Sequence, residues 1–285
     1  MPASSGFKLT YSTMFNPPPQ LHARFDAALA DFRRDGMGRD HAQWIGGASV
    51  GGARHFEVRS PIDQDWLIGR FVEASAQDVD RAVQAAQAAY PAWAATPWRE
   101  RVALLRRAAR LIEERVYAIS AAVALEVGKN RMESIGEVQE TADLIDWYCD
   151  QMEAHDGFDR ALPDDPLPQF RSHNRTVLRP YGVWAVIAPF NFPFALAGGP
   201  LGPALVAGNT AVFKVSPETS LSGRLLLDVL HDAGLPAGVI NFVTGGDAVG
   251  RALVEHPGVA GITFTGSQGG GPHGLRQARQ GRHPR

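Results

Sequence analysis

The spacing of apolar residues divides the chain into two parts. Between positions 75 and 152, apolar side chains recur every three or four residues, a period typical of amphipathic helices that cover a core. After position 180, short continuous apolar runs alternate with helical stretches, which predicts parallel strands joined by crossover helices. The runs that we predict as strands are 183–188, 210–215, 239–243 and 261–265. The predicted fold is therefore a doubly wound α/β sheet preceded by a helical segment.

Capping residues set the limits of the expected helices. Ser75 can cap a first helix, and Asp78 places negative charge in its first turn. Thr96 and Pro97 are expected as the N-cap and the first residue of a second helix, because proline is favoured at that position. We expect this second helix to run without a break until Gly128.

Cys149, the only cysteine of the chain, lies on the apolar stripe of a third helix expected over 135–152. Buried cysteine behaves as a small hydrophobe, whereas a reactive thiolate needs an electropositive and partly open setting. The neighbouring Asp146 and Asp150 would oppose a thiolate. We expect Cys149 to be buried and unreactive.

The remaining segments have weaker patterns. Residues 1–60 are predicted to form an irregular arm with a strand or two, such as 55–59. Residues 61–74 suggest a hairpin. A stretch rich in proline and aspartate, 155–175, marks a boundary, and 170–178 is expected to form a strand there.

Polar residues stand where the predicted strands end. Asn191 lies in the turn after the first strand, and Lys214 closes the second strand in a chain with few lysines. A glycine turn that includes Gly246 and Gly250 precedes the short helix after the third strand. Open parallel sheets bind ligands beyond the carboxyl ends of their strands, and helix N-termini favour phosphate. The pattern therefore indicates a nucleotide site at this edge.

Each of these features also has a purely structural interpretation. The turn 245–250 lacks the G-x-G-x-x-G spacing and fits an ordinary strand-to-helix turn equally well. Asn191 could cap the helix that follows it, as short polar side chains do. Lys214 could be a solvated cation at the end of a strand. The residues alone leave both interpretations open.

Composition narrows the classes of partner. The 285 residues carry a net charge of −2 and are 45% hydrophobic, enough for a sizeable core and without the basic surface that nucleic acids or membranes require. No run approaches the roughly 18 apolar residues of a membrane span, and no signal peptide is expected. A single cysteine suits a reducing compartment, so a cytoplasmic location is expected. We predict no metal site.

Four motifs in sequence bear a family resemblance. RPYGVWAVIAPFNFPF (179–194), GNTAVFKVS (208–216), GLPAGVINFVTGG (234–246) and GITFTGS (261–267) together resemble the cofactor-binding half of the aldehyde dehydrogenase superfamily. The resemblance extends over about 62–267, and several long motifs in the family's order make it specific. Residues 126–152 are most similar to the 1-pyrroline-5-carboxylate (glutamate γ-semialdehyde) dehydrogenases of proline breakdown.

The resemblance implies a Rossmann-like domain that binds NAD, with NADP as the alternative. Lys214 would bind the adenosine ribose with Ser216 close by, while Gly246 and Gly250 would form the glycine turn. The family often has glutamate three residues after this lysine, but here the acid, Glu218, comes one residue later, so its ribose contact is left open. Further residues expected to line the coenzyme, or to form merely structural loops, are Ile187, Ala188, Pro189, Phe190, Phe264, Thr265, Gly266 and Ser267.

The resemblance also implies the chemistry. Asn191 matches the family's oxyanion asparagine, which stabilises the adduct that a cysteine thiolate forms with a small-molecule aldehyde. The adduct gives hydride to the nicotinamide, and water activated by a glutamate hydrolyses the thioester. Both the nucleophile and that base would lie after the fourth strand, where this sequence instead has a tail unlike the family, 268–285. We therefore expect the catalytic domain to be missing and the chain alone to be inactive.

These expectations give a division of the chain and competing functions. The parts are an arm (1–60), a helical part of the cofactor domain (61–155), a boundary with an oligomerisation strand (156–178), a Rossmann-like core (179–267) and the tail (268–285). Homo-oligomers are expected from the family. Besides a truncated dehydrogenase, a nucleotide-binding or interaction module without catalysis and an unstable fragment without function remain open.

Overall fold

The structure, a computed structural model, describes residues 13, 16–167, 169 and 171–267. Its helical elements are α1 (Pro19–Asp31), the π-helical turn η1 (Phe32–Gly36), α2 (Ala76–Ala95), α3 (Trp98–Glu114), α4 (Val116–Val127), α5 (Arg131–Ala154), the 3-10 turn η2 (Asp156–Phe158), α6 (Ala195–Val206), the 3-10 turn η3 (Pro217–Thr219), α7 (Ser220–Asp232) and α8 (Asp247–Glu255). Its strands are β1 (Arg39–His41), β2 (Gln43–Ile45), β3 (Ala48–Val50), β4 (His55–Arg59), β5 (Leu67–Val72), β6 (Asp159–Ala161), β7 (Arg175–Val177), β8 (Val183–Ile187), β9 (Thr210–Lys214), β10 (Ile240–Phe242) and β11 (Gly261–Phe264). The expected tail, 268–285, lies outside the described residues.

The main sheet has the predicted doubly wound topology. Its strand order is β11-β8-β9-β10-β2-β3, and the four strands from β11 to β10 are parallel. From β8 the chain moves outward to β9 and β10, and then returns to place β11 on the other side of β8. The order therefore reverses between β8 and β11, and in such sheets the crevice at the reversal is where ligands bind.

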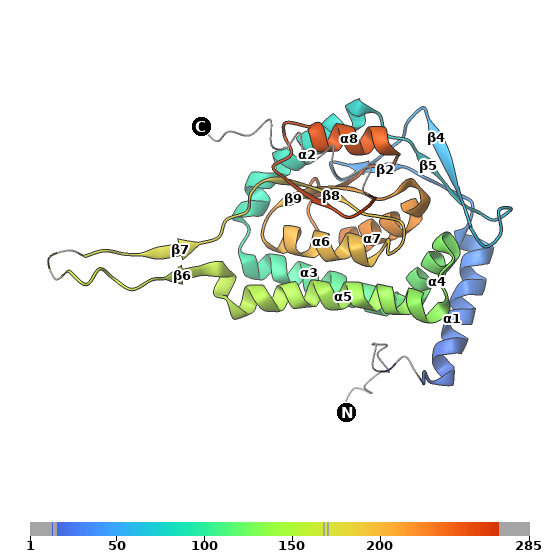
Figure 1. The fold of residues 1–285 in the computed structure, drawn as a ribbon, viewed down its shortest axis with the longest axis horizontal. Helices are drawn as coiled ribbons and strands as arrows, with labels where there is room; N and C mark the ends of the chain where they lie inside the picture. Colours follow the sequence, from blue (N-terminus) through green and yellow to red (C-terminus); the bar gives the residue numbers. More distant parts are fainter. Residues whose placement is uncertain (1–12, 14–15, 168, 170, 268–285) are drawn as a thin grey trace.

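Both faces of the central strands β8, β9 and β10 are buried, which explains their nearly continuous apolar sequences. Alternate residues of β8 point to opposite faces. Val183, Ala185 and Ile187 pack with α2 and α8, whereas Val186 packs toward α6, α7, α3 and α5. Figure 1 shows the resulting layers: α2 and α8 above the sheet, α6 and α7 below it, and α3 and α5 as a further helical layer.

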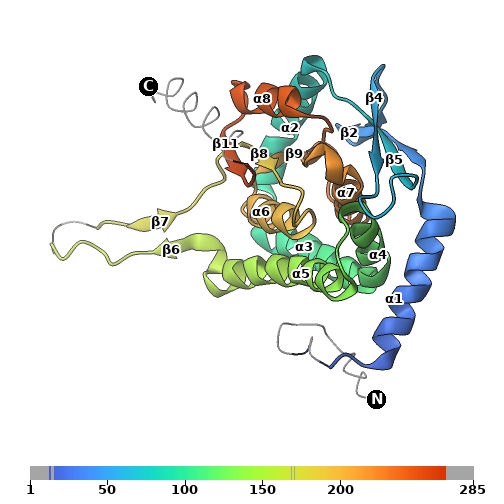
Figure 2. The same cartoon turned by 45° about the vertical axis from the view of Figure 1, so that its right-hand side comes forward.

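Two hairpins extend from the layered body. The strands β4 and β5 form a small sheet with β1, on the side where α1 packs against α4. On the opposite side, β6 and β7 pair antiparallel and project away from the body (Figures 1 and 2). The strand expected over 170–178 is thus β7, although Phe170 lies outside the described residues. None of the described helices is both long and apolar enough to span a membrane.

The described part of the N-terminal segment is more regular than the irregular arm expected over 1–60. Residues 19–31 form α1, and β2 and β3 join the main sheet antiparallel beside β10. Pro19 occupies the first turn of α1, where its missing N–H costs no hydrogen bond. Leu21 and Phe25 lie one turn apart and are buried against α4 and α5. The predicted strand at 55–59 is confirmed as β4.

Two expected helix limits also need correction. The helix predicted to run from Pro97 to Gly128 is two helices, because the backbone leaves helical geometry at Arg115 (φ −101°, ψ 11°). Thr96 ends α2, with its hydroxyl donating to the carbonyl of Ala92, and Pro97 is the N-cap of α3. The predicted cap at Ser75 is confirmed, and Asp78 completes a capping box, with each side chain bonded to the other's backbone N–H.

Candidate functional site

The carboxyl ends of β8, β9 and β11 are joined by backbone hydrogen bonds beyond the strands themselves. The N–H of Ala188 donates to Lys214 O at 3.0 Å, and the N–H of Ser216 donates back to Ala188 O at 3.0 Å. Across the reversal point, the N–H of Thr265 donates to Ile187 O at 3.1 Å. Five of the predicted site residues therefore meet at one edge of the sheet.

The residues that continue from these strand ends are more open. Phe190 is 60% exposed and Phe264 is 38% exposed, which is unusual for large aromatic side chains. Gly266 and Ser267 are exposed, and Pro189 is half-buried. The edge thus presents an open, partly apolar surface above a buried floor.

Lys214 is the buried cation of this edge. Its side chain is 5% exposed, and its Nζ donates to the carbonyl of Val215 at 2.9 Å. Burial lowers the pKa of Lys214 to about 8, and the carboxylates of Asp247 and Glu218 oppose this shift. Lys214 is therefore not the solvated cation of the alternative interpretation. Its contact with a coenzyme stays a prediction.

The glycine turn before α8 lies beside this lysine. A Cβ placed on Gly250 would be 3.6 Å from Lys214 Cε, while one placed on Gly246 would meet no atom within 4 Å. Gly246 is the N-cap of α8 and provides no side-chain cap. The helix end is therefore open to a group from outside, and the positive lysine and backbone N–H groups suit a nucleotide phosphate or ribose.

Glu218, the acid that comes one residue later than in the family pattern, contacts Ser216. The hydroxyl of Ser216 donates to the carboxylate of Glu218, which is exposed at the start of η3. The two side chains thus occupy the same corner of the edge as Lys214. The structure brings the predicted residues of this corner together.

Asn191 is exposed in the turn between β8 and α6. Asn191 is not the N-cap of α6. The N-cap is Phe194, whose side chain makes no capping hydrogen bond. The capping interpretation of Asn191 is therefore wrong, and its oxyanion role stays a prediction.

Two buried carboxylates from other helices accept hydrogen bonds from the first N–H groups of the helices that follow the site loops. Glu137 of α5 accepts from the N–H groups of Phe194 (2.7 Å) and Ala195 (3.2 Å) at the start of α6. Glu126 of α4 accepts from the N–H groups of Leu221 (2.7 Å) and Ser222 (2.9 Å) at the start of α7. Burial raises the pKa of Glu126 to about 7.

Sequence reasoning missed both carboxylates. Glu126 is 3% exposed and Glu137 is 2% exposed, whereas a glutamate on a helix normally faces solvent. The sequence held one indication of their burial, which is their position: Glu126 follows the buried Leu125, and Glu137 precedes the buried Val138.

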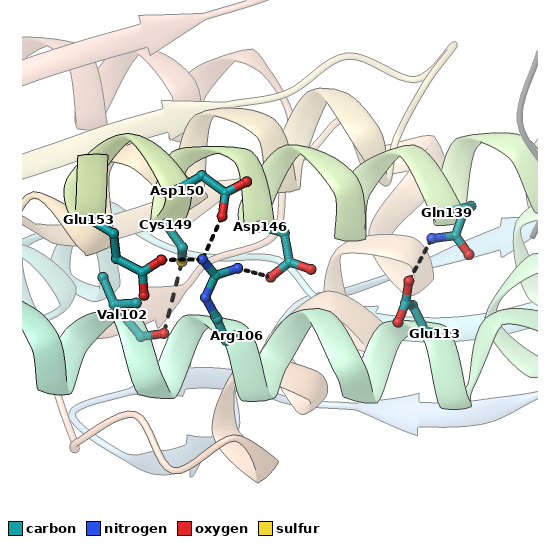
Figure 3. Close-up of polar contacts among 8 residues, drawn as sticks. All are labelled: Val102, Arg106, Glu113, Gln139, Asp146, Cys149, Asp150 and Glu153. Atoms are coloured by element: carbon teal, nitrogen blue, oxygen red, sulfur yellow. Dashed lines mark hydrogen bonds and ion pairs between the residues drawn. The ribbon is translucent and has the colours of Figure 1, made fainter. Parts of the chain in front are cut away.

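Cys149 is buried, as predicted, on the side of α5 that packs against α3. It is fully buried, its Sγ is 3.9 Å from the carbonyl of Val102, and burial raises its pKa to about 12. Figure 3 shows the thiol beside the guanidinium of Arg106, which bonds Asp150 and two further carboxylates of α5. Such a thiol cannot act as a nucleophile near neutral pH.

Comparison with known proteins places this geometry in a family. The aldehyde dehydrogenase family profile matches residues 47–283, which is most of the chain. The chain belongs to the aldehyde dehydrogenase family. This match confirms the family resemblance of the four motifs.

Two curated relatives show how far the similarity extends. An N-succinylglutamate 5-semialdehyde dehydrogenase of Serratia proteamaculans is 38% identical over 237 residues, covering 83% of this chain and 47% of the relative. A 1-pyrroline-5-carboxylate dehydrogenase of Staphylococcus epidermidis is 35% identical over 250 residues, covering 87% of this chain and 47% of the relative. The chain spans about half the length of the curated relatives it matches.

A solved structure agrees. A 1-pyrroline-5-carboxylate dehydrogenase from Thermus with bound NAD superposes with a TM-score of 0.87 at 30% identity, over 95% of this chain and 52% of that one. The fold described above is therefore shared with this solved aldehyde dehydrogenase over about half of that protein's length.

Proposed function

We propose that this chain is the coenzyme-binding part of an NAD(P)-dependent aldehyde dehydrogenase that oxidises glutamate γ-semialdehyde, the open form of 1-pyrroline-5-carboxylate, to glutamate in proline degradation. The observation that carries the proposal is the buried Lys214 beside the open N-terminus of α8, at the reversal edge of a doubly wound sheet. The names of the relatives support the substrate.

In this proposal each residue of the edge has a task. Lys214 and Ser216 hold the adenosine ribose, and Gly246 and Gly250 leave room for the nucleotide beside α8. NAD or NADP supplies the hydride acceptor when bound. The side-chain amide of Asn191 donates to the oxygen that gains negative charge, which stabilises the transition state.

The remaining predicted residues form the floor and rim of the coenzyme site. The floor is the buried pair Ile187 and Ala188. The rim residues are Pro189, Phe190, Glu218, Phe264, Thr265, Gly266 and Ser267.

These 285 residues are proposed to bind the coenzyme without turning over the aldehyde. Their only cysteine, Cys149, is buried between helices with its pKa raised to about 12. A second candidate function therefore follows from this thiol: a nucleotide-binding module that acts without catalysis.

Calorimetric titration with NAD and with NADP, alongside an assay of NAD reduction with glutamate γ-semialdehyde, separates these functions. Saturable binding of one coenzyme without turnover supports the coenzyme-binding part. Absence of binding by a folded sample overturns both candidates, and turnover would overturn the conclusion drawn from Cys149. A Lys214→Met variant serves as the control for binding at the proposed edge.

We further propose that the chain forms homo-oligomers through the β6–β7 hairpin and works in the cytoplasm. The hairpin projects from the body and exposes apolar side chains at Leu162 (47%) and Leu167 (56%). Two-stranded hairpins are marginally stable by themselves, so contact with another copy would stabilise this one. The single unpaired cysteine supports a reducing compartment.

A further inference from the structure

The turn that carries Asn191 is anchored from a different layer of the protein. Phe194 and Ala195 begin α6, and their N–H groups donate to the same oxygen, Oε1 of Glu137, at 2.7 and 3.2 Å. Glu137 lies 57 residues before Phe194 in the sequence. Its helix, α5, lies on the side of α6 that faces away from the sheet. The start of α6 is thus fixed to the helical layer by one carboxylate oxygen.

The second oxygen of Glu137 accepts from Lys129. Lys129 Nζ lies 2.5 Å from Oε2, and the two side chains are 11% and 0% exposed. The same ammonium lies 3.3 Å from the centre of the Phe192 ring, close enough for a cation–π contact. Lys129 therefore touches both the anchor and the residue next to Asn191.

The charges of this arrangement balance. Burial raises the pKa of Glu137, whereas Lys129 and the two N–H groups lower it. A carboxylate without such partners would be costly to bury, and removing one member of a buried pair leaves the other charge uncompensated. The pair and the turn are therefore coupled: displacing either side chain weakens the hold on residues 192–195.

We infer that Lys129 and Glu137 are a positioning pair, which fixes the turn so that the amide of Asn191 faces the coenzyme edge. The inference rests on the proposed function, because it assigns the pair to the reactive end of that edge. Neither residue touches the coenzyme in this proposal. They act through the main chain of α6 and through the ring of Phe192.

The test compares amide hydrogen exchange in the segment 188–196 with exchange in the rest of the chain. In Glu137→Gln, the amide oxygen can still accept from α6, but the NH₂ group replaces the acceptor of Lys129. In Lys129→Met, the carboxylate loses its cation. Each single variant should speed exchange of 188–196 by about tenfold and weaken coenzyme binding several-fold, the loss typical of a charged hydrogen bond.

The double variant Lys129→Met with Glu137→Gln is the decisive one. It removes both charges together, keeps an oxygen for the N–H groups of α6 and keeps an apolar contact for Phe192, since methionine packs well on aromatic rings. Exchange and affinity should return to within about twofold of the wild type, as expected when a pair is removed without leaving a lone charge. Glu140→Gln, on the same helix, is the matched control and should change neither.

Two outcomes would overturn the inference. One is exchange at 188–196 that is the same in Glu137→Gln as in Glu140→Gln. The other is an increase spread evenly over all helices and strands, which would make the pair a general support of the fold. If the wild type binds no coenzyme, the proposed function fails, yet the exchange data still decide whether the pair holds the turn.

Discussion

At the scale of single residues, the candidate site depends on ionisable side chains buried behind an open edge. Lys214, Glu126 and Glu137 are each at most 5% exposed, and each bonds main-chain groups of a loop that ends or begins at this edge. Sequence reasoning found Lys214 because lysine is scarce in this chain and this one closes an apolar strand. It missed the glutamates, because helical periodicity does not show which polar residue beside a stripe reaches a neighbouring helix end.

Coenzyme binding should weaken as pH rises through the pKa of Lys214. Burial lowers that pKa from 10.5 to about 8, so the ammonium form is lost in the folded protein between about pH 7 and 9. A charged donor bonds ribose oxygens more strongly than a neutral one, and the dissociation constant should rise about fivefold to tenfold over this range. Calorimetry across pH measures it, and Lys214→Met should show weak binding without the pH step.

The same lysine should affect stability in the opposite direction. Between pH 8 and 10.5 the unfolded state binds more protons at Lys214 than the folded state does, so the free energy of unfolding should rise with pH in this window. Urea unfolding of the wild type and of Lys214→Met isolates this contribution.

The binding prediction has its own contrary outcome. A coenzyme affinity that stays constant from pH 7 to 9.5 would contradict the role of the Lys214 ammonium in binding.

Cys149 should resist alkylation in the folded chain. With its pKa raised to about 12 by burial, only a minute fraction is thiolate at pH 8. Labelling with iodoacetamide should be at least about 10³-fold slower than in urea, where the thiol is exposed and has an ordinary pKa. Mass spectrometry of timed samples measures both rates, and rapid labelling of the native protein would contradict the buried position of this side chain.

At the scale of elements, the sequence pattern predicted those strands and helix ends that are marked by a continuous apolar run or by capping residues. The four parallel strands and the start of α2 are confirmed, since apolar runs and the box of Ser75 and Asp78 act locally. The break between α3 and α4 at Arg115 has no such marker, because arginine is a good helix former. In the segment expected to be irregular, Pro19 does not prevent α1 from forming, because proline is compatible with the first turn of a helix.

Arg106 should stabilise the packing of α3 on α5. Its guanidinium bonds Asp146 (3.2 Å), Asp150 (2.5 Å) and Glu153 (2.6 Å), which lie along one side of α5 (Figure 3). Arg106→Met would leave three neighbouring carboxylates without their cation. Because these side chains are partly exposed, we expect a loss of about 1 kcal/mol in the free energy of unfolding.

Chemical unfolding at low and high salt tests this expectation. Salt screens the repulsion that remains in the variant, so its deficit should shrink at about 1 M salt, where the Debye length is about 3 Å. Arg107→Met, at the next and exposed position of α3, is the matched control and should stay within about 0.5 kcal/mol of the wild type. A deficit that does not depend on salt would show that Arg106 acts by packing alone.

At the scale of the whole molecule, two of the places where the described residues expose large apolar side chains are the edge of the main sheet and the projecting hairpin. Phe190 and Phe192 lie in the turn after β8, and Phe264 lies at the end of β11. Leu162 and Leu167 lie on the projecting hairpin. Sequence analysis predicted the strand of the hairpin but gave no direct sign of its projection, because exposure depends on how the layers are assembled.

Self-association should depend on the hairpin and not on exposed apolar residues in general. We expect sedimentation velocity at micromolar concentrations to show dimers or larger species for the wild type, and monomers for Leu162→Glu combined with Leu167→Glu, since charges in an apolar interface are costly to desolvate. Ile62→Glu is the matched control: this side chain is 55% exposed in the connection between β4 and β5, two strands that lie on the opposite side of the body from the hairpin. A monomeric wild type, or equal dissociation by the control, would rule out the hairpin as the oligomerisation element.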